Sequence, residues 1–250
     1  MRKFISRLLV AGTLTVPMLS SAFVLGPTTP GKWGAAAMGT GATVTYSFMA
    51  TGTSCNAEFA GCTISHLSSF TPAGWQTAIT SAFAAWSSVA NITFTEVADA
   101  GEAFDASGLS GDIRIGGHVF DGPFGTLAHG FFPPINGSTA AGDIHFDIAE
   151  TWDIGFAGSG FDLFQVMAHE IGHAIGLDHT LVPSSLMNAF YDETFSGPQT
   201  DDIAGAVFIY GPAVTTEVPE PTSLALVGLA LAAIRLVRRR SQTVQTRAHL

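Results

Sequence analysis

Three histidines and one glutamate in a short stretch of the chain have the spacing of a catalytic metal site. Residues 169–179 read His-Glu-Ile-Gly-His-Ala-Ile-Gly-Leu-Asp-His, which places His169 and His173 four positions apart. On an α-helix, two residues at this spacing project from one face, one turn apart, and can grip a single ion. The glycine at 176 lets the backbone leave the helix through a left-handed conformation, and the chain can then return with His179 as a third imidazole.

This ligand set favours a catalytic zinc ion over a structural one. Three neutral imidazoles leave one coordination position open, and zinc lowers the pKa of a water molecule there toward neutrality. Glu170 is rotated by about 100° from His169 around the helix, so it lies beside the ligands and can move the proton to a leaving amine. A bare His-Glu-x-x-His pattern also arises by chance, with one histidine in a core and one in solvent, but Gly176 and His179 at the right offsets argue against that alternative. The stretch predicts a zinc hydrolase.

The elements around this stretch follow the order of an α+β domain. Asp162 is expected to cap the motif helix, with Gln165 as its capping-box partner, and the helix is expected to end near Ile175. A first helix is predicted from Thr71-Pro72 onward, and a last helix over 199–210. The expected strands are 42–49, 91–97, 112–115, 127–132 and 142–147. Helices packed on one sheet are the natural architecture for this order.

The distribution of charge and the two cysteines indicate which partners and which cellular compartment the protein suits. Between Arg7 and Arg235 the only basic residues are Lys32 and Arg114, whereas all 20 carboxylates lie there. Such a field repels nucleic acid and anionic lipid and suits a calcium-rich exterior, although a merely soluble acidic surface has the same composition. The chain has two cysteines, Cys55 and Cys62, for which a local disulfide is favoured and a free pair is the alternative.

The two ends read as targeting segments. Residues 1–22 have a basic start, an apolar stretch and small residues at the end, as in a secretory signal; a short transmembrane anchor is the alternative. Residues 213–221 form a polar, proline-containing linker. The following apolar run, 224–237, is marginal in length for a bilayer span, and Arg238-Arg239-Arg240 favours a cytoplasmic end.

The body of the chain resembles the matrixin branch of the metzincin zinc proteases. The resemblance rests on residues 169–180 together with Ser185-Leu186-Met187, and on the segments 75–97 and 202–211, which are similar to the family's first helix with its following strand and to its closing helix. It implies a twisted mixed sheet with an active-site helix, a first helix and a C-terminal helix. It also implies that Met187 forms a hydrophobic floor beneath the zinc histidines and that Tyr191 lines the specificity pocket. The proline that family members usually carry two residues after this methionine is Ala189 here.

Residues 121–129 and 142–147 are also matrixin-like, and the resemblance implies further metals there. His129 and His145 would hold a second, structural zinc with His118, but no acid stands two residues after His118 as it does in the family. The ion could then be held by three histidines and water, or be absent, with His118 in solvent. The implied calcium ligands are Asp121, Asp147 and Glu150, the carbonyls of Gly122, Phe124 and Thr126, and Asp143 for a further ion. The strand around 127–131 is similar to the edge strand on which matrixins lay an extended polypeptide substrate.

The tail resembles a PEP-CTERM sorting signal of Gram-negative bacteria. Val218-Pro219-Glu220-Pro221 is followed in order by the apolar run and the arginines. The resemblance implies recognition by an exosortase, removal of the tail, and delivery to the cell envelope or extracellular matrix. A simple C-terminal anchor is the alternative.

These observations divide the chain into a signal peptide (1–22), a catalytic domain (27–212), a linker (213–221) and a sorting or anchor segment (218–240). We expect a secreted, monomeric zinc endopeptidase that uses Glu170 as its base, cleaves polypeptides, binds no nucleic acid and meets a membrane only through its C-terminal segment. The alternative is an envelope or matrix module that keeps the metzincin fold without turnover.

Overall fold

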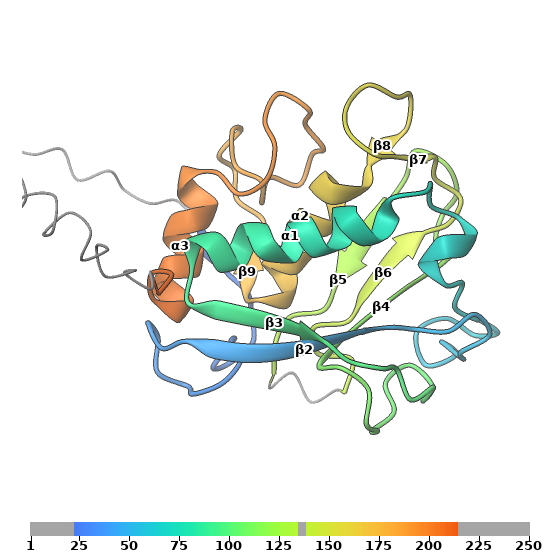
Figure 1. Cartoon of the computed structure of the whole chain (residues 1–250), viewed down its shortest axis with the longest axis horizontal. Helices are drawn as coiled ribbons and strands as arrows, with labels where there is room; N and C mark the ends of the chain where they lie inside the picture. Colours follow the sequence, from blue (N-terminus) through green and yellow to red (C-terminus); the bar gives the residue numbers. More distant parts are fainter. Residues whose placement is uncertain (1–22, 135–138, 215–250) are drawn as a thin grey trace, which may run out of the picture. The chain divides into compact units, whose positions relative to one another are not determined.

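A five-stranded mixed sheet forms one layer of the domain (Figure 1). The computed structural model describes residues 23–134 and 139–214. The strands lie in the order β3-β2-β4-β6-β5, and all neighbours are parallel except β5, which runs antiparallel to β6 at one edge. Their bounds are β2 Ala42–Phe48, β3 Ile92–Glu96, β4 Ile113–His118, β5 Ala128–Gly130 and β6 Ile144–Asp147. All five expected strands are present, and 127–131 lies at the sheet edge as predicted.

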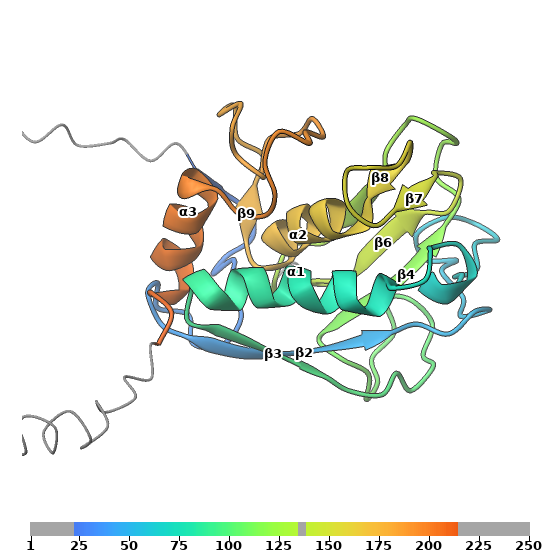
Figure 2. The same cartoon turned by 45° about the horizontal axis from the view of Figure 1, so that its top comes forward.

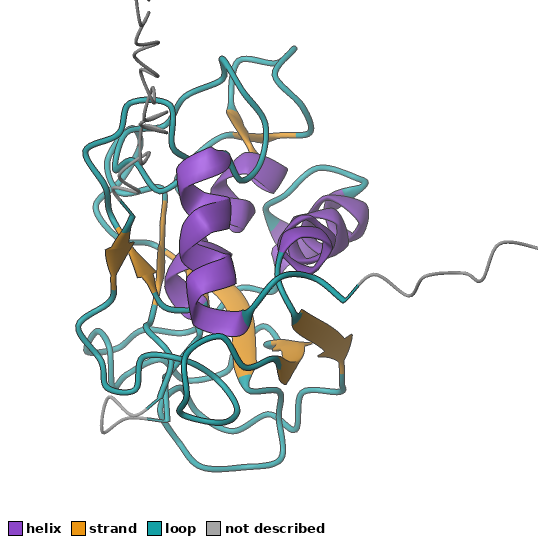
Figure 3. Ribbon diagram, turned by 90° about the vertical axis from the view of Figure 1, so that its left-hand side faces the viewer, coloured by secondary structure: helices purple, strands orange, loops and turns teal. Residues whose placement is uncertain are grey.

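The three α-helices of the described residues are α1 (Trp75–Val89), α2 (Leu163–Ala174) and α3 (Thr200–Tyr210). α1 and α2 cover one face of the sheet (Figure 2). α1 and α2 pack against each other, and α3 runs across their ends rather than alongside them (Figures 1 and 3). The core between the layers includes the fully buried Trp86 of α1, whose indole Nε1 donates to the carbonyl oxygen of Ala168 in α2 at 2.8 Å. The α+β metzincin architecture expected from the sequence is confirmed.

Two local predictions need correction. α1 begins at Trp75 rather than at Thr71-Pro72, because Gly74 adopts φ +97° and forms its N-cap. Asp162 caps α2 as predicted, accepting from the backbone amide of Gln165 at 2.8 Å, but the capping box is wrong. The side chain of Gln165 is engaged elsewhere: it accepts from the amide of Gly197 at 2.9 Å and donates to the carbonyl of Asp192 at 3.2 Å.

Two short strand pairs and one 3-10 turn were not predicted. β1 (Val24–Leu25) pairs antiparallel with β9 (Leu177–Asp178), the two residues before His179. β7 (Trp152–Asp153) pairs in parallel with β8 (Phe161–Asp162) immediately before α2. A single 3-10 turn, η1 (Leu67–Ser69), precedes α1. These pairs are too short for any alternation of apolar residues to reveal them.

The two cysteines form the predicted local disulfide, Cys55–Cys62, in the connection between β2 and η1. Within the described ranges, no helix is both long enough and apolar enough to cross a membrane. The predicted signal peptide and the predicted sorting segment lie outside the described residues.

Lys32 and Arg114, the basic residues of the central region, are both buried, with exposed fractions of 1% and 5%. The Lys32 ammonium donates to the carbonyl of Trp33 at 2.9 Å and lies 5.1 Å from the centre of the Tyr210 ring. Burial lowers its pKa. Arg114 donates through Nε to Asp99 at 2.9 Å. Both positive charges therefore interact with groups inside the domain and not with solvent.

Candidate metal centres

The helix α2 places His169, Glu170 and His173 at the boundary between the two layers. Met167, Ala168, Ile171 and Ala174 are fully buried and fix the rotation of the helix against the core. His169 and His173 therefore emerge on a different side, one turn apart, with their ring centres 4.9 Å apart. His169 and His173 therefore share one face of α2, as their spacing of four residues predicted.

The turn after α2 brings the third histidine to the other two. Gly176 adopts φ +109°, and its amide donates to the carbonyl of His173 at 2.9 Å. The chain then passes through β9 and reaches His179, whose Nε2 lies 3.1 Å from Nε2 of His169 and 3.2 Å from Nε2 of His173. We call His169, His173 and His179 the first cluster. Its three nitrogens converge on one point, as the sequence motif predicted.

The hydrogen bonds of the first cluster select the protonation state that binds metal. Nδ1 of His169 is 2.6 Å from the carbonyl oxygen of Leu186, and Nδ1 of His173 is 2.8 Å from that of Leu177. A carbonyl can only accept, so each Nδ1 carries the proton and each Nε2 presents a lone pair. Burial, together with the neighbouring histidines, lowers the pKa of His169 to about 3, and burial lowers that of His173 to about 4. Both rings are neutral at physiological pH, the form in which imidazole ligates zinc.

Glu170 lies beside the first cluster with one oxygen unsatisfied. The residue is 5% exposed, and its Oε2 has no hydrogen-bond partner among the described residues. Burial raises the pKa of this carboxyl to about 8, against an opposing hydrogen bond from the amide of Gly130. A buried carboxylate oxygen without a partner next to three converging lone pairs is the arrangement expected of a proton acceptor in a metal site.

Met187 packs against α2, the helix that carries His169 and His173, and its role as a floor beneath the first cluster stays a prediction. It is 2% exposed, and its sulfur lies against Gly172 of α2, where a side chain would overlap it. Asp202 of α3 supports this turn: its carboxylate accepts from the amides of Leu186 at 2.7 Å and Met187 at 3.0 Å, and from the hydroxyl of Ser185. The sequence analysis placed Asp202 only in the last helix and in the segment similar to the family's closing helix, so its role in holding the methionine turn was missed.

A cleft of about 710 Å³ opens over the first cluster. The edge strand β5 forms one wall, and the segment after Met187 forms the other. Among the residues that line it are Leu127, Val166, Glu170, Ala189 and Tyr191. The Tyr191 hydroxyl accepts from the amide of Asp162 at 2.8 Å and is 3.1 Å from Glu193, so the ring is fixed in the wall of the cleft. The role of Tyr191 in a specificity pocket stays a prediction.

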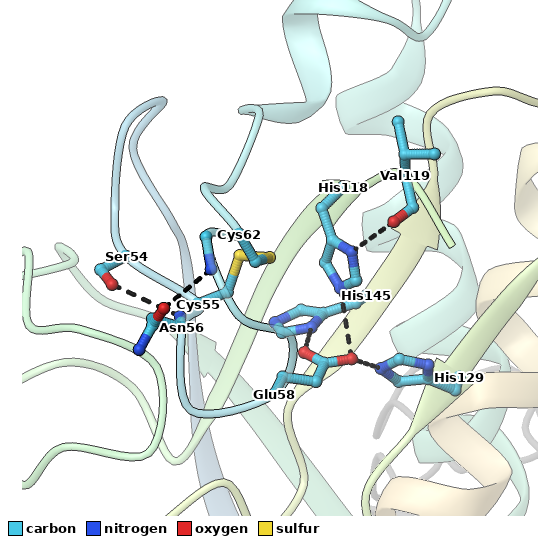
Figure 4. The surroundings of a disulfide bond; sticks show 10 residues. Ser54, Cys55, Asn56, Glu58, Cys62, His118, Val119, His129 and His145 are labelled. Atoms are coloured by element: carbon cyan, nitrogen blue, oxygen red, sulfur yellow. Dashed lines mark hydrogen bonds and ion pairs between the residues drawn. A yellow bond between two sulfur atoms is a disulfide. The ribbon is translucent and has the colours of Figure 1, made fainter. Parts of the chain in front are cut away.

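A second cluster gathers where the Cys55–Cys62 loop meets the histidines of β4, β5 and β6 (Figure 4). It consists of His118, His129 and His145, as predicted, and of Glu58, which the sequence analysis missed. The four residues each offer a ligand atom within 4.8 Å of the others. Burial alone would raise the pKa of Glu58, but hydrogen bonds from the three histidines hold it well below its ordinary value. The only clue to Glu58 in the sequence was its position inside the small Cys55–Cys62 loop.

The predicted calcium ligands lie close along the chain but form no such group. Within the described ranges, the first and second clusters are the only groups of three or more side chains placed to hold a metal. Asp121 accepts from the amide of Thr126 at 3.1 Å within the loop that carries Gly122 and Phe124, and Glu150 accepts from the amide of Gly125 at 3.2 Å, which ties this loop to the turn after β6. Asp147 keeps its Oδ2 buried without a hydrogen bond.

Asp143 lies apart from this loop. It is 1% exposed, its Oδ1 accepts from the amide of Arg114 at 2.8 Å, and burial raises its pKa well above the ordinary value. The calcium sites remain predictions.

The fold and the first cluster define a metzincin-type architecture, and comparison with known proteins gives the family. Residues 60–211 match the family described as Matrixin, and the chain belongs to this family. Residues 217–241 match the PEP-CTERM protein-sorting motif, which indicates export and sorting to the cell envelope.

Three relatives illustrate the similarity. Karilysin of Tannerella forsythia is 40% identical over 144 residues, 54% of this chain and 28% of the relative. Stromelysin-3 of Homo sapiens is 44% identical over 144 residues, 54% of this chain and 27% of the relative. Matrix metalloproteinase-20 of Homo sapiens is 42% identical over 139 residues, with the same two shares of 54% and 27%. The chain thus spans little more than a quarter of the length of each.

Proposed function

We propose that this protein is a secreted zinc-dependent endopeptidase of the matrixin type. The observation that carries the proposal is the convergence of three Nε2 lone pairs beside the unpartnered, buried Oε2 of Glu170. The residues fit zinc, because three neutral imidazoles are a common catalytic ligand set for this ion. Bound there, zinc would polarise the scissile carbonyl and lower the pKa of the attacking water.

The protein's own residues supply the proton transfers. Glu170 accepts the proton of the attacking water and passes it to the departing amine nitrogen as the peptide bond breaks. The hydrogen bonds from His169 and His173 to backbone carbonyls hold both rings in the ligating tautomer throughout. Gly130 of β5 lies directly against Glu170, where any side chain would collide with the backbone of α2, so the strand and the base can stay close together.

Polypeptides are the substrate class that the cleft favours. β5 is the edge of the sheet, and its outer backbone groups can pair with an extended peptide whatever its side chains. Such a peptide would run through the cleft past Glu170, with one side chain directed toward Ala189 and Tyr191. The sorting motif supports recognition by an exosortase-type enzyme, removal of the tail and delivery to the envelope or extracellular matrix of a Gram-negative bacterium.

Replacing the base tests the peptidase function against the alternative of a binding or structural module. In the full-length chain, Glu170→Ala should lower the rate of cleavage of an unfolded protein by about 10²- to 10⁴-fold, the range for a general base, with zinc content unchanged. Glu96→Ala, which removes an exposed carboxylate on β3, is the matched control and should leave the rate unchanged. Activity of Glu170→Ala within a few-fold of the wild type would remove the assigned base. A wild-type chain with no chelator-sensitive cleavage in the presence of calcium would favour the module.

A further inference from the structure

The loop that carries Glu58 is held rigidly by its own contacts. The disulfide Cys55–Cys62 closes it, and the amide of Cys55 donates to the carbonyl of Cys62 at 3.2 Å. Within the loop, the amide of Glu58 donates to the carbonyl of Cys55 at 2.9 Å, and the amide of Gly61 donates to the side chain of Asn56 at 2.8 Å. The backbone of Glu58 is therefore fixed within the loop, and the bridge between Ser65 and Gly117 ties the following segment to β4.

The loop points the Glu58 carboxylate into the histidines of the second cluster (Figure 4). Its Oε1 lies 3.2 Å from Nε2 of His118 and 2.8 Å from Nε2 of His129, and its Oε2 lies 2.6 Å from Nδ1 of His145. The ligand atoms of a tetrahedral zinc ion lie about 3.3 Å apart, and the distance from Glu58 to His118 matches this spacing. The distances to His129 and His145 are shorter, and a bound ion would require a small outward shift of these side chains. Side-chain exposures are 9% for Glu58, 4% for His118, 0% for His145 and 31% for His129, so the cluster is closed to solvent except at His129.

The hydrogen bonds of His118 indicate that a cation belongs between these groups. Nδ1 of His118 lies 3.0 Å from the carbonyl oxygen of Val119, which can only accept, so the ring proton is on Nδ1. In the neutral ring, Nε2 then presents a lone pair to the carboxylate of Glu58. Two acceptors that face each other in a buried site repel unless a proton or a metal ion lies between them. Three imidazoles and one carboxylate are ligands that zinc accepts.

We propose that Glu58 is the fourth ligand of a zinc ion bound by the second cluster and that the Cys55–Cys62 disulfide holds it in that position. The carboxylate thus comes from a disulfide-closed loop far from the other ligands in sequence, and not from a position two residues after His118. Four protein ligands leave no open position, so this ion is structural. The inference does not depend on peptidase activity, because metal content is the readout.

Zinc content of the full-length chain tests the ligand. At a buffered zinc concentration that saturates both clusters, the wild type should hold two zinc ions per chain, one for each cluster. Glu58→Gln should hold one, because the amide oxygen is a far weaker ligand, and the control Glu96→Gln should hold two. A single ion in the wild type that is lost in His173→Ala would overturn the assignment and leave the second cluster as a buried ion pair. Two ions in Glu58→Gln with unchanged affinity would show that the second ion does not need this carboxylate.

Reduction of the wild type tests the disulfide without any substitution. A phosphine donates two electrons to the S–S bond, and water supplies two protons, so that two thiols form. The phosphine takes the oxygen of the same water molecule and becomes its oxide. The dissociation constant of the second ion should rise by about 10- to 100-fold, the effect typical of losing a group that orients a ligand. The double variant Cys55→Ala, Cys62→Ala should match the reduced protein and show no further response to phosphine. A constant that stays within about twofold on reduction would refute the positioning role.

A zinc-edge anomalous difference map of wild-type crystals covers the case in which Glu58→Gln does not fold. A peak about 2.0–2.2 Å from a Glu58 oxygen is expected. A peak held by the three histidines alone, with Glu58 turned away, would contradict the proposal.

Discussion

The two histidine clusters share a ligand type and differ in how they are built and enclosed. The first cluster comes from 11 consecutive residues, 169–179, and borders the cleft, with His179 exposed. The second cluster draws one residue each from the Cys55–Cys62 loop, β4, β5 and β6, and Glu58, His118 and His145 are nearly inaccessible to solvent. An open three-ligand site leaves room for water and substrate, whereas a closed four-ligand site can only hold segments together. The cluster proposed to be catalytic is thus local in sequence and accessible, and the cluster proposed to be structural is assembled from distant segments and mostly buried.

Removing one ligand from each cluster gives the largest expected contrast. His173→Ala should abolish zinc binding at the first cluster and lower kcat/KM by about 10⁴-fold or more, because several kcal/mol of transition-state stabilisation are lost. His118→Ala should lower the thermal midpoint but change kcat/KM by less than about tenfold, because His118 does not border the cleft. Both rates are measured together with zinc per chain. Equal losses of activity would mean that the second cluster also serves the chemistry.

Substitutions at Asp202 test whether the turn that carries Met187, next to the first cluster, depends on a distant residue in α3. Asp202→Asn replaces one carboxylate oxygen by an NH2 group, which then faces the buried amide of either Leu186 or Met187, and should lower the free energy of unfolding by about 2–4 kcal/mol. Asp201→Asn, at the adjacent position in the first turn of α3, should lower it by about 0.5 kcal/mol. Denaturant titration measures both values. Similar values for the two variants would show that the methionine turn stands without its carboxylate anchor.

Gly176 tests the backbone that turns His179 toward its partners. Both Gly176 and Gly52 have positive φ, +109° and +92°, but a Cβ at 176 would overlap the carbonyl oxygen of Gly31, whereas a Cβ at 52 meets open space. Gly52→Ala should therefore lower the free energy of unfolding by about 1 kcal/mol from strain alone, and Gly176→Ala by about 2–3 kcal/mol, with weaker zinc binding. Equal effects in thermal or denaturant unfolding would show that the contact with Gly31 is unimportant.

Most of the first cluster could be predicted from the sequence because its geometry is helical. His169, Glu170 and His173 take their relative positions from one turn of α2, and Gly176 marks the point at which the chain leaves it. The strands of the sheet were also predictable, because each contains a short run of residues that favour a β-strand. Their order was not predicted, and only the edge position of β5 came from the resemblance to a known family.

The missed features depend on contacts between distant segments. Glu58 meets the histidines because sheet pairing places β4, β5 and β6 side by side and a bridge between Ser65 and Gly117 anchors the preceding loop next to β4. No local spacing marks it as a ligand. Gln165 was correctly placed three residues after the cap, but its side chain reaches Gly197 and Asp192 instead of the cap backbone. Tertiary hydrogen bonds outcompeted the local one.

The burial of Lys32 and Arg114 has a consequence for the life of the protein outside the cell. Trypsin-like enzymes cut only after lysine or arginine, and from residue 8 to residue 234 the chain contains no other such residue. With exposed fractions of 1% and 5%, neither offers a strand of backbone to a foreign active site. The folded domain can therefore persist among secreted digestive enzymes of this specificity without an inhibitor or a protective coat.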